Sequence, residues 1–172
     1  VREKATRLPQ KVLLDILGEP LTLCLLKRLC LAKEIDQVVL TTSTHPEDDV
    51  LETLAIQNEF AVFRGSELDK LDRYYHAAIQ FGFDAVIIVD GDDLLCFPEG
   101  IDHIARLFRQ QLYDCIYLSD LPLGAAATGL STRALAKVLE LKDEMDTEVW
   151  GGYFIGSGFF NAHSTTLEDP LL

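Results

Sequence analysis

The chain has 172 residues and a formal charge of −13, with 28 Asp and Glu against 15 Lys and Arg. Hydrophobic residues make up 48% of it, so a packed core is expected and extensive disorder is excluded. The acidic balance excludes a protein that coats nucleic acid, because phosphate binding needs a basic face. No apolar run is long enough for a membrane span and no signal region is apparent, so we expect one cytoplasmic domain over residues 1–172.

Segments that favour strands alternate with segments that favour helices along the chain. Strands are predicted at 37–42, 60–63, 84–90, 114–119 and 124–130. Helices are predicted at 18–33, 44–55, 65–82, 98–110 and 131–142. This alternation predicts an open α/β sheet with helices on both faces. Ligands of such sheets bind at the carboxyl ends of the strands, so the segments that directly follow the strands are the candidate site.

The segment VDGDD places three carboxylates directly after the apolar strand at 84–90, namely Asp90, Asp92 and Asp93. Carboxylates this close repel one another, and a divalent cation relieves the repulsion. Mg²⁺ and Mn²⁺ prefer such hard oxygen ligands, and Mg²⁺ commonly takes only one or two protein carboxylates. The alternative is an Asp-rich turn in contact with solvent.

Basic residues occur at two further places where an anion could bind. Arg64 ends the strand at 60–63, and Gly65 and Ser66 then lead into a helix whose N-terminus attracts anions. The alternative at this position is an ordinary strand–helix turn with a salt-bridged arginine. Four cations also lie within the first eleven residues, as Arg2, Lys4, Arg7 and Lys11. Basic chain ends are common, so composition alone leaves this segment undecided.

The cysteines and the late aromatic residues have less specific patterns. Cys24, Cys30, Cys96 and Cys115 fit no zinc-ligand spacing, so we expect buried free thiols in a reducing compartment. Five aromatic residues cluster late in the chain, as Trp150, Tyr153, Phe154, Phe159 and Phe160. They favour a core or a dimer interface, with a sugar-stacking wall as the alternative.

The first eleven residues, VREKATRLPQK, resemble the loop A-R-x-G-S-x-R-L-P-G-K of cytidylyltransferases that activate acidic sugars. These enzymes form the acylneuraminate and spore-coat polysaccharide branch. The segments TSTHPEDD, VFRGSELDKLDRYYHAA and VDGDDLL resemble further blocks of that family in the same order, and TEVWGGYF followed by GFF resembles a late block. The resemblance covers nearly the whole chain. It implies a three-layer α/β/α Rossmann-like open sheet of the nucleotide-diphospho-sugar transferase type.

The resemblance also implies a reaction and roles for individual residues. Arg2, Arg7 and Lys11 fall on the loop that holds the triphosphate of CTP, and Arg64 falls on an arginine that contacts the nucleotide. Asp92 falls on the aspartate that binds Mg²⁺, with Mn²⁺ as the alternative ion. The implied reaction transfers CMP from CTP to a sugar acid and releases pyrophosphate, and Lys11 and Arg7 offset the charge of the leaving group.

On the sugar side, the resemblance places Tyr153 and Phe160 near the acceptor, and it allows a homodimer. The chain departs from the family pattern at Gln10 and at Lys4-Ala5, where the loop has Gly and Gly-Ser. A strand that precedes the loop and an aspartate block that follows LEDPLL are not in the sequence. The resemblance therefore implies a gap in the sheet beside the strand at 84–90.

Two other functional classes remain open on the residues. A glycosyltransferase could use Asp90-Gly91-Asp92 as a D-x-D motif that holds Mn²⁺ and a nucleotide-sugar. Such an enzyme has no use for an R-L-P-x-K loop, which favours the cytidylyltransferase. The other alternative is a non-catalytic protein that keeps the fold as a nucleotide-binding or ligand-sensing module.

Overall fold

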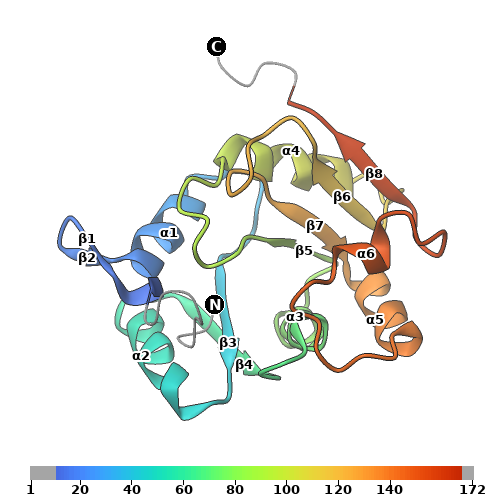
Figure 1. Ribbon diagram of the computed structural model, residues 1–172. Coiled ribbons are helices and arrows are strands. Elements are labelled where there is room, and N and C mark those ends of the chain that lie inside the picture. The colour runs from blue at the N-terminus through green and yellow to red at the C-terminus, as the bar shows by residue number, and fades with distance from the viewer. Residues whose placement is uncertain (1–10, 168–172) are drawn as a thin grey trace.

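Strands β3 (Val39–Ser43) and β4 (Ala61–Gly65) pair in parallel and form the first part of the sheet in the computed structural model, which describes residues 11–167. The second part has the strand order β5-β7-β6-β8. Its strands are β5 (Ala85–Ile88), β6 (Cys115–Leu118), β7 (Thr128–Ser131) and β8 (Ala162–Thr165). A short hairpin of β1 (Asp15–Ile16) and β2 (Glu19–Pro20) lies outside both parts (Figure 1).

Five helices occupy the connections that the apolar periodicity predicts, and a sixth, the short α6 (Gly151–Phe154), was not predicted. The five are α1 (Leu21–Leu29), α2 (Asp49–Gln57), α3 (Lys70–Phe81), α4 (Pro98–Phe108) and α5 (Thr132–Leu141). Two 3₁₀ turns, η1 (Lys11–Leu13) and η2 (Pro46–Asp48), precede the hairpin and α2. Within the described range, no helix is both long enough and apolar enough to cross a lipid bilayer.

The strand directions differ in part from the sequence expectation. Segments 84–90 and 124–130 were expected in an open sheet of repeated strand–helix units, but β7 runs antiparallel to both of its neighbours, β5 and β6. In the described part of the chain, β6–β8 and β3–β4 are the parallel pairs. A mixed sheet follows because the connection from β6 to β7, residues 119–127, contains no helix that could carry a parallel crossover.

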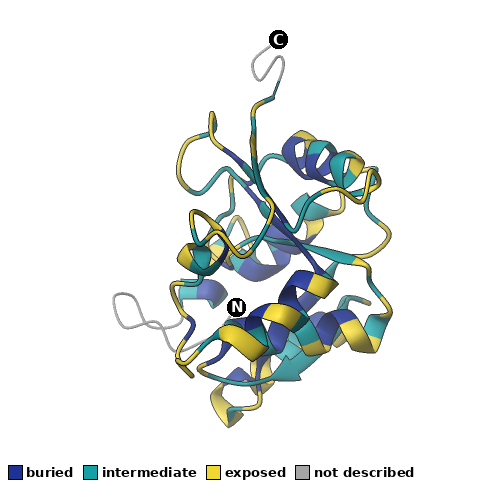
Figure 2. Ribbon diagram, turned by 90° about the vertical axis from the view of Figure 1, so that its right-hand side faces the viewer, coloured by how far each residue is buried: buried dark blue, intermediate teal, exposed yellow. Residues whose placement is uncertain are grey.

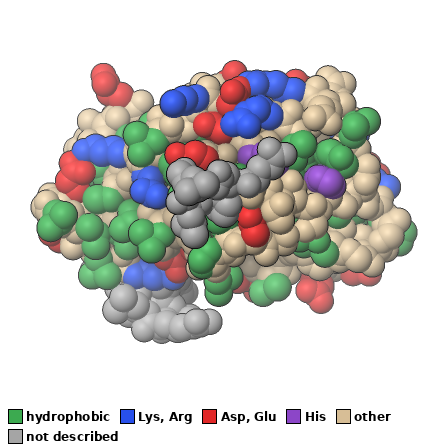
Figure 3. Space-filling model, turned by 90° about the horizontal axis from the view of Figure 1, so that it is seen from above, with side chains coloured by type: hydrophobic (Ala, Val, Ile, Leu, Met, Phe, Trp, Pro, Cys, Tyr) green, Lys and Arg blue, Asp and Glu red, His purple; other side chains and the backbone are tan. Residues whose placement is uncertain are grey.

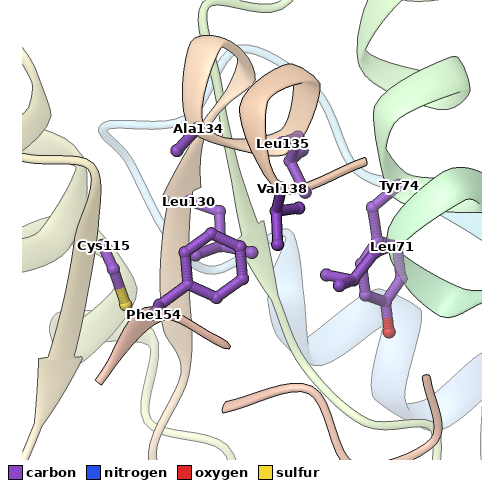
Figure 4. Close-up of a cluster of buried hydrophobic side chains, with 8 residues drawn as sticks. All are labelled: Leu71, Tyr74, Cys115, Leu130, Ala134, Leu135, Val138 and Phe154. Atoms are coloured by element: carbon purple, nitrogen blue, oxygen red, sulfur yellow. The ribbon is translucent and has the colours of Figure 1, made fainter. Parts of the chain in front are cut away.

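Three apolar clusters fill the space between the sheet and the helices. One joins α3 and α5 to β6 and β7, and its eight buried residues point toward one another in Figure 4. A second joins α4 to β6 and the residues that follow α1, and the third joins α1 and α2 to β3. Helices α1, α2 and α4 therefore cover one face and α3 and α5 the other, which confirms a three-layer arrangement. In Figure 2 the buried residues concentrate on the helix and strand surfaces that face one another.

The ends of α3 are fixed by the residues that border it. The Asp69 side chain caps its N-terminus by accepting a hydrogen bond from the Asp72 N–H at 3.1 Å. Gly82 ends the helix with φ of +72°, a left-handed conformation that glycine adopts without steric cost. The helix therefore begins directly beside the carboxyl end of β4.

The two parts of the sheet face each other across a gap beside β5. One edge of β5 pairs with β7, and no hydrogen-bonded pairing between β5 and β3 is seen within residues 11–167. Residues 38–41 and 85–89 instead line opposite sides of one cavity. The gap beside the strand at 84–90 that the family resemblance implied is therefore present.

The cysteines are only partly as expected. All four are free thiols, and Cys96 and Cys115 are buried, but Cys24 is half-buried and Cys30 is exposed. Cys30 follows the last residue of α1, where the apolar stripe of the helix no longer turns it toward the core. Burial raises the pKa of Cys96 to about 11 and that of Cys115 to about 12, so these two thiols stay protonated near neutral pH.

Candidate functional site

The acidic segment after β5 forms a tight turn. The Asp93 N–H donates to the Asp90 carbonyl at 3.0 Å, and the Cys96 N–H donates to the Asp93 carbonyl at 2.9 Å. These backbone bonds close a turn that carries the three carboxylates at the carboxyl end of β5. The turn therefore concentrates negative charge at the end of a strand, which is where the sequence predicts the site.

Lys11 reaches this turn from the beginning of the described chain. Its Nζ lies 2.5 Å from Oδ2 of Asp92, across a sequence separation of 81 residues. The bond from Lys11 lowers the pKa of Asp92, and the nearby charge of Lys70 lowers it further. The structure thus brings together two residues that the resemblance assigned separately to phosphate and to metal.

Asp93 has a different electrostatic environment from Asp92. Burial, followed by the charges of Asp90 and Asp92, raises the pKa of Asp93 to about 6. The backbone of Gly124 contributes to this burial, since a Cβ at that position would lie 3.2 Å from Asp93 Oδ1. Asp92 is therefore fully ionised at neutral pH, whereas Asp93 is the carboxyl of this turn that is most easily protonated.

A second lysine, which the sequence analysis did not identify, contacts the same turn. Lys70 Nζ lies 3.3 Å from Asp90 Oδ1 and 3.0 Å from Glu148 Oε1. Lys70 is the first residue of α3, and Glu148 belongs to the connection between α5 and α6. The sequence offered one sign that Lys70 belongs to the site, namely that it follows the end of β4 by five residues. Lysines at the start of helices are usually exposed, so this sign was weak.

The connection that carries Glu148 is anchored to the start of α3 by a buried polar network. Asp69 accepts from Thr147 Oγ1 at 2.8 Å and pairs with the Lys142 ammonium. The Leu71 N–H donates to Thr147 Oγ1 at 3.1 Å, and the Thr147 N–H donates to the Leu68 carbonyl at 3.2 Å. Burial would raise the pKa of Asp69, but the bonds from Lys142, the Asp72 N–H and Thr147 outweigh it and lower the pKa.

Arg64 holds the connection between β3 and α2. Its guanidinium donates to the carbonyls of Ser43 and His45, both at 2.9 Å, and pairs with Asp49 at 2.6 Å and Glu52 at 2.8 Å. The hydrogen bonds that Glu52 and then Asp49 accept from the guanidinium raise the pKa of Arg64. Arg64, for which the sequence predicts contact with the nucleotide, therefore stabilises the neighbouring loop in this structure.

Gly65, beside Arg64, permits close packing of α3. A Cβ at Gly65 would lie 2.7 Å from the Phe63 ring and 3.2 Å from the Arg73 side chain. The sequence analysis placed Gly65 in a turn that leads into a helix N-terminus able to attract anions, and in the structure its nearest neighbours are the side chains of Phe63 in β4 and Arg73 in α3.

Four further residues were assigned from the family resemblance, and the structure describes two of them. Arg2 and Arg7 are outside the residues that the structure describes. Tyr153 and Phe160 pack against the cluster between α3, α5 and β6. The Phe160 ring lies 4.8 Å from that of Phe154, and the Lys137 ammonium lies 5.1 Å from the Phe160 centroid. Within residues 11–167, neither Tyr153 nor Phe160 lines the cavity beside β5.

That cavity has a volume of about 1510 Å³ and joins the gap in the sheet to the charged residues. Its inner part is lined by residues 38–41 and 85–89 and by apolar positions of α1 and α3. Eleven charged residues are also among its lining, and five of them form the contacts described above, namely Lys11, Lys70, Asp90, Asp92 and Glu148. Mixed charge is also visible on the outer surface, where acidic and basic side chains lie next to one another on the face seen from above (Figure 3).

The described residues fit a metal that takes few protein ligands. In the range 11–167, no three His, Cys, Asp or Glu side chains are arranged to hold a metal ion together. Asp92 nevertheless presents an ionised oxygen that already attracts the Lys11 cation. Mg²⁺ needs only one or two such carboxylates when substrate phosphates complete its shell. The donor set therefore suits a metal that binds with a nucleotide rather than a metal held by protein alone.

Comparison with protein families gives one match that covers most of the chain. The family model described as "Cytidylyltransferase" matches residues 1–154. The chain is 31% identical over 136 residues to the uncharacterized protein MJ1063 of Methanocaldococcus jannaschii, which covers 79% of this chain and 56% of the relative. It is 30% identical over 155 residues to the spore coat polysaccharide biosynthesis protein SpsF of Bacillus subtilis, which covers 86% and 65%. The chain thus spans somewhat more than half the length of these relatives.

Solved structures show the same fold. A cytidylyltransferase from Leptospira borgpetersenii superposes with a TM-score of 0.87 at 24% identity, covering 98% of this chain and 74% of that one. A CMP:2-keto-3-deoxy-manno-octonic acid synthetase complexed with CTP superposes with a TM-score of 0.74 at 13% identity, covering 97% and 88%. At these identities the likeness establishes the arrangement of the strands and helices.

Proposed function

Because this chain belongs to the cytidylyltransferase family, we propose that it transfers CMP from CTP to a sugar acid and releases pyrophosphate. The observation that carries this proposal is the contact between Lys11 and Asp92 at the carboxyl end of β5. It supports the proposal because a cation that could bind phosphate and a carboxylate that could hold a metal lie in contact in the lining of a large cavity. Nucleotidyl transfer needs this pair of charges at one phosphate chain.

In the proposed reaction, a hydroxyl oxygen of the sugar bonds to the α-phosphorus of CTP while the bond from that phosphorus to the bridging oxygen of pyrophosphate breaks. The hydroxyl proton is released to water, and pyrophosphate leaves with the electron pair of the broken bond. Lys11 donates hydrogen bonds to the phosphate oxygens and offsets the charge that develops on pyrophosphate. Asp92 would hold a divalent cation, which when bound neutralises negative charge on the phosphates. The reaction depends mainly on positioning and electrostatic stabilisation, because no covalent enzyme intermediate is needed.

Lys11 and a divalent cation compete for Asp92 in this scheme. Lys11 occupies the Asp92 oxygen in the structure, and an incoming triphosphate offers it several oxygens in exchange. Once Lys11 turns to the phosphates, Asp92 is available to the cation that the phosphates bring with them. Nucleotide and metal therefore bind cooperatively.

The acidic-sugar acceptor rests on the relatives. SpsF takes part in spore coat polysaccharide biosynthesis, and further relatives of 29–30% identity are 3-deoxy-manno-octulosonate cytidylyltransferases of Francisella tularensis. The family match also favours nucleotidyl transfer over a glycosyltransferase that reads Asp90-Gly91-Asp92 as a D-x-D motif.

Calorimetric titration with the four ribonucleoside triphosphates in the presence of Mg²⁺ tests the nucleotide part of the proposal. We expect CTP to bind more tightly than UTP, ATP or GTP. Equal or tighter binding of a purine nucleotide would overturn the assignment to CTP.

A further inference from the structure

Lys70 lies at the point where three segments of the cavity wall meet. It begins α3, and its ammonium contacts Asp90 after β5 and Glu148 in the connection between α5 and α6. The Lys70 side chain is 11% exposed, whereas the side chains of Asp90 and Glu148 are 55% and 53% exposed. The ammonium therefore lies beneath two carboxylates that face the solvent. All three residues line the cavity that also contains Lys11 and Asp92.

Lys70 is not needed to hold the backbone of the α5–α6 connection. Thr147, next to Glu148, is already bonded to Asp69 Oδ1 through its hydroxyl and to the Leu68 carbonyl through its N–H. Lys142 adds a buried ion pair to Asp69. These bonds fix the position of the segment, so the distinct contribution of Lys70 is its charge and the orientation of the two carboxylates.

The charge balance of the cavity depends on this lysine. In the ion pairs around the acidic turn, Asp90, Asp92 and Glu148 carry three negative charges, and Lys11 and Lys70 carry two positive ones. The buried Arg73 also lines the cavity, but its guanidinium donates to the Ser66 carbonyl. Without Lys70, Asp90 and Glu148 would repel each other and would also repel a polyphosphate that approaches Lys11. An excess of negative charge would at the same time favour free metal cations.

We propose that Lys70 is a positioning residue that neutralises Asp90 and Glu148 and so keeps the cavity receptive to the triphosphate of a nucleotide. This inference rests on the proposed function for the identity of the ligand, and it adds a residue that the family resemblance did not assign. Lys70 acts through the two carboxylates and is covered by them, so it is not placed against the substrate.

The test compares two equilibria that respond in opposite directions to the loss of one positive charge. For Lys70→Met, we expect CTP measured in EDTA to bind about tenfold more weakly and Mn²⁺ measured without nucleotide to bind several-fold more tightly. Lys70→Arg retains the charge and should stay close to the parent in both titrations. Lys27→Met removes a lysine from the exposed pair with Glu19 and serves as the matched control, with no expected change.

Glu148→Gln removes a negative charge instead of a positive one and keeps Lys70. It should bind CTP at least as tightly as the parent and Mn²⁺ more weakly, and it remains informative if Lys70→Met does not fold. Hydrogen exchange of the Thr147 N–H should be as slow in Lys70→Met as in the parent, since its bond to the Leu68 carbonyl and the Asp69 network remain.

The outcomes separate this inference from the proposed function. If the parent binds Mn²⁺ but not CTP, the proposed function fails. The change in Mn²⁺ affinity in Lys70→Met then tests the role of Lys70 by itself. Unchanged affinities in Lys70→Met, or weaker binding of both ligands, would overturn the inference. If the parent binds neither ligand alone, the comparison is made for CTP at saturating Mg²⁺, where Lys70→Met should again bind about tenfold more weakly than the parent. A parent that binds no CTP there either overturns both proposals.

Discussion

Lys11 and Asp92 are 81 residues apart in the sequence, yet Lys11 Nζ lies 2.5 Å from Asp92 Oδ2. The acidic turn after β5 is therefore paired with a cation of the chain itself, Lys11. Because phosphate oxygens can replace Asp92 as the partner of Lys11, the contact provides a physical reason for nucleotide and metal to bind together. The predictions below test this arrangement and the stability of the fold around it.

Asp92→Asn should reduce metal-dependent activity far more than Asp93→Asn does. The amide cannot supply the negative charge that a divalent cation needs, and loss of one catalytic metal contact is worth several kcal/mol, so a decrease on the order of 100-fold is expected. Initial rates of pyrophosphate release over a range of Mg²⁺ concentrations measure the effect. Similar rates for both variants and the parent would show that the metal is bound elsewhere.

Asp93→Asn should stabilise the fold at pH 8 and lose that advantage in acid. The pKa of Asp93 is raised to about 6 in the folded protein, so its ionised form is disfavoured there relative to the unfolded chain. The destabilisation by ionised Asp93 is fully present above pH 6 and disappears as the pH falls toward about 3.8, the pKa of this group in the unfolded chain. Thermal melting in EDTA at pH 8 and pH 4 measures it, and a variant that gains most at pH 4 would contradict the assigned direction.

Arg64→Ala should destabilise the fold. The guanidinium bonds two carbonyls and two carboxylates of the β3–α2 connection, and its side chain is 20% exposed. We expect the free energy of unfolding to fall by about 2 kcal/mol, and Arg64→Lys to restore only part of it because the ammonium lacks the planar fork. Urea denaturation provides the measurement. If Arg64→Ala melts like the parent but loses CTP affinity, Arg64 serves the nucleotide and not the loop.

The four thiols should differ in reactivity. Cys30 is exposed and Cys24 half-buried, whereas Cys96 and Cys115 are buried with pKa values raised to about 11 and about 12. Iodoacetamide at pH 8 should therefore label Cys30 first and leave Cys96 and Cys115 unmodified in the folded protein. Peptide mass spectrometry identifies the labelled residues, with urea-unfolded protein as the positive control. Early labelling of Cys115 in native protein would contradict the packing of the core.

The sequence predicts most elements well because apolar periodicity and local signals agree. Gly82 ends α3 where its position suggests, and α4 begins at Pro98. The antiparallel direction of β7 relative to β6 was missed, although the predicted strands 114–119 and 124–130 leave no room for the helix of a parallel crossover. The sequence does not show that β7 lies between β5 and β6. The apolar segment of β5 is equally compatible with parallel and antiparallel neighbours.

The sequence identifies the parts of the site that have a rare residue pattern, and it misses residues whose pattern is common. Three aspartates after an apolar strand identify the turn at Asp90–Asp93 directly. Lys70 resembles any helix-start lysine, and only the fold shows that Asp90 and Glu148 converge on it. Tyr153 and Phe160 suit either a sugar wall or a core, and the structure places them against the core cluster. Aromatic composition alone cannot distinguish these environments.

Turnover with defined acceptors tests the central proposal most directly. The full chain is incubated with CTP, Mg²⁺ and either 3-deoxy-manno-octulosonate, an acylneuraminate or a neutral hexose, and both pyrophosphate and CMP-sugar are quantified. The account predicts equal amounts of pyrophosphate and CMP-sugar with an acidic sugar, little product with the hexose, and loss of both products in Asp92→Asn. Failure to form a CMP-sugar with any of the acidic acceptors, in protein that binds CTP and melts cooperatively, would contradict it.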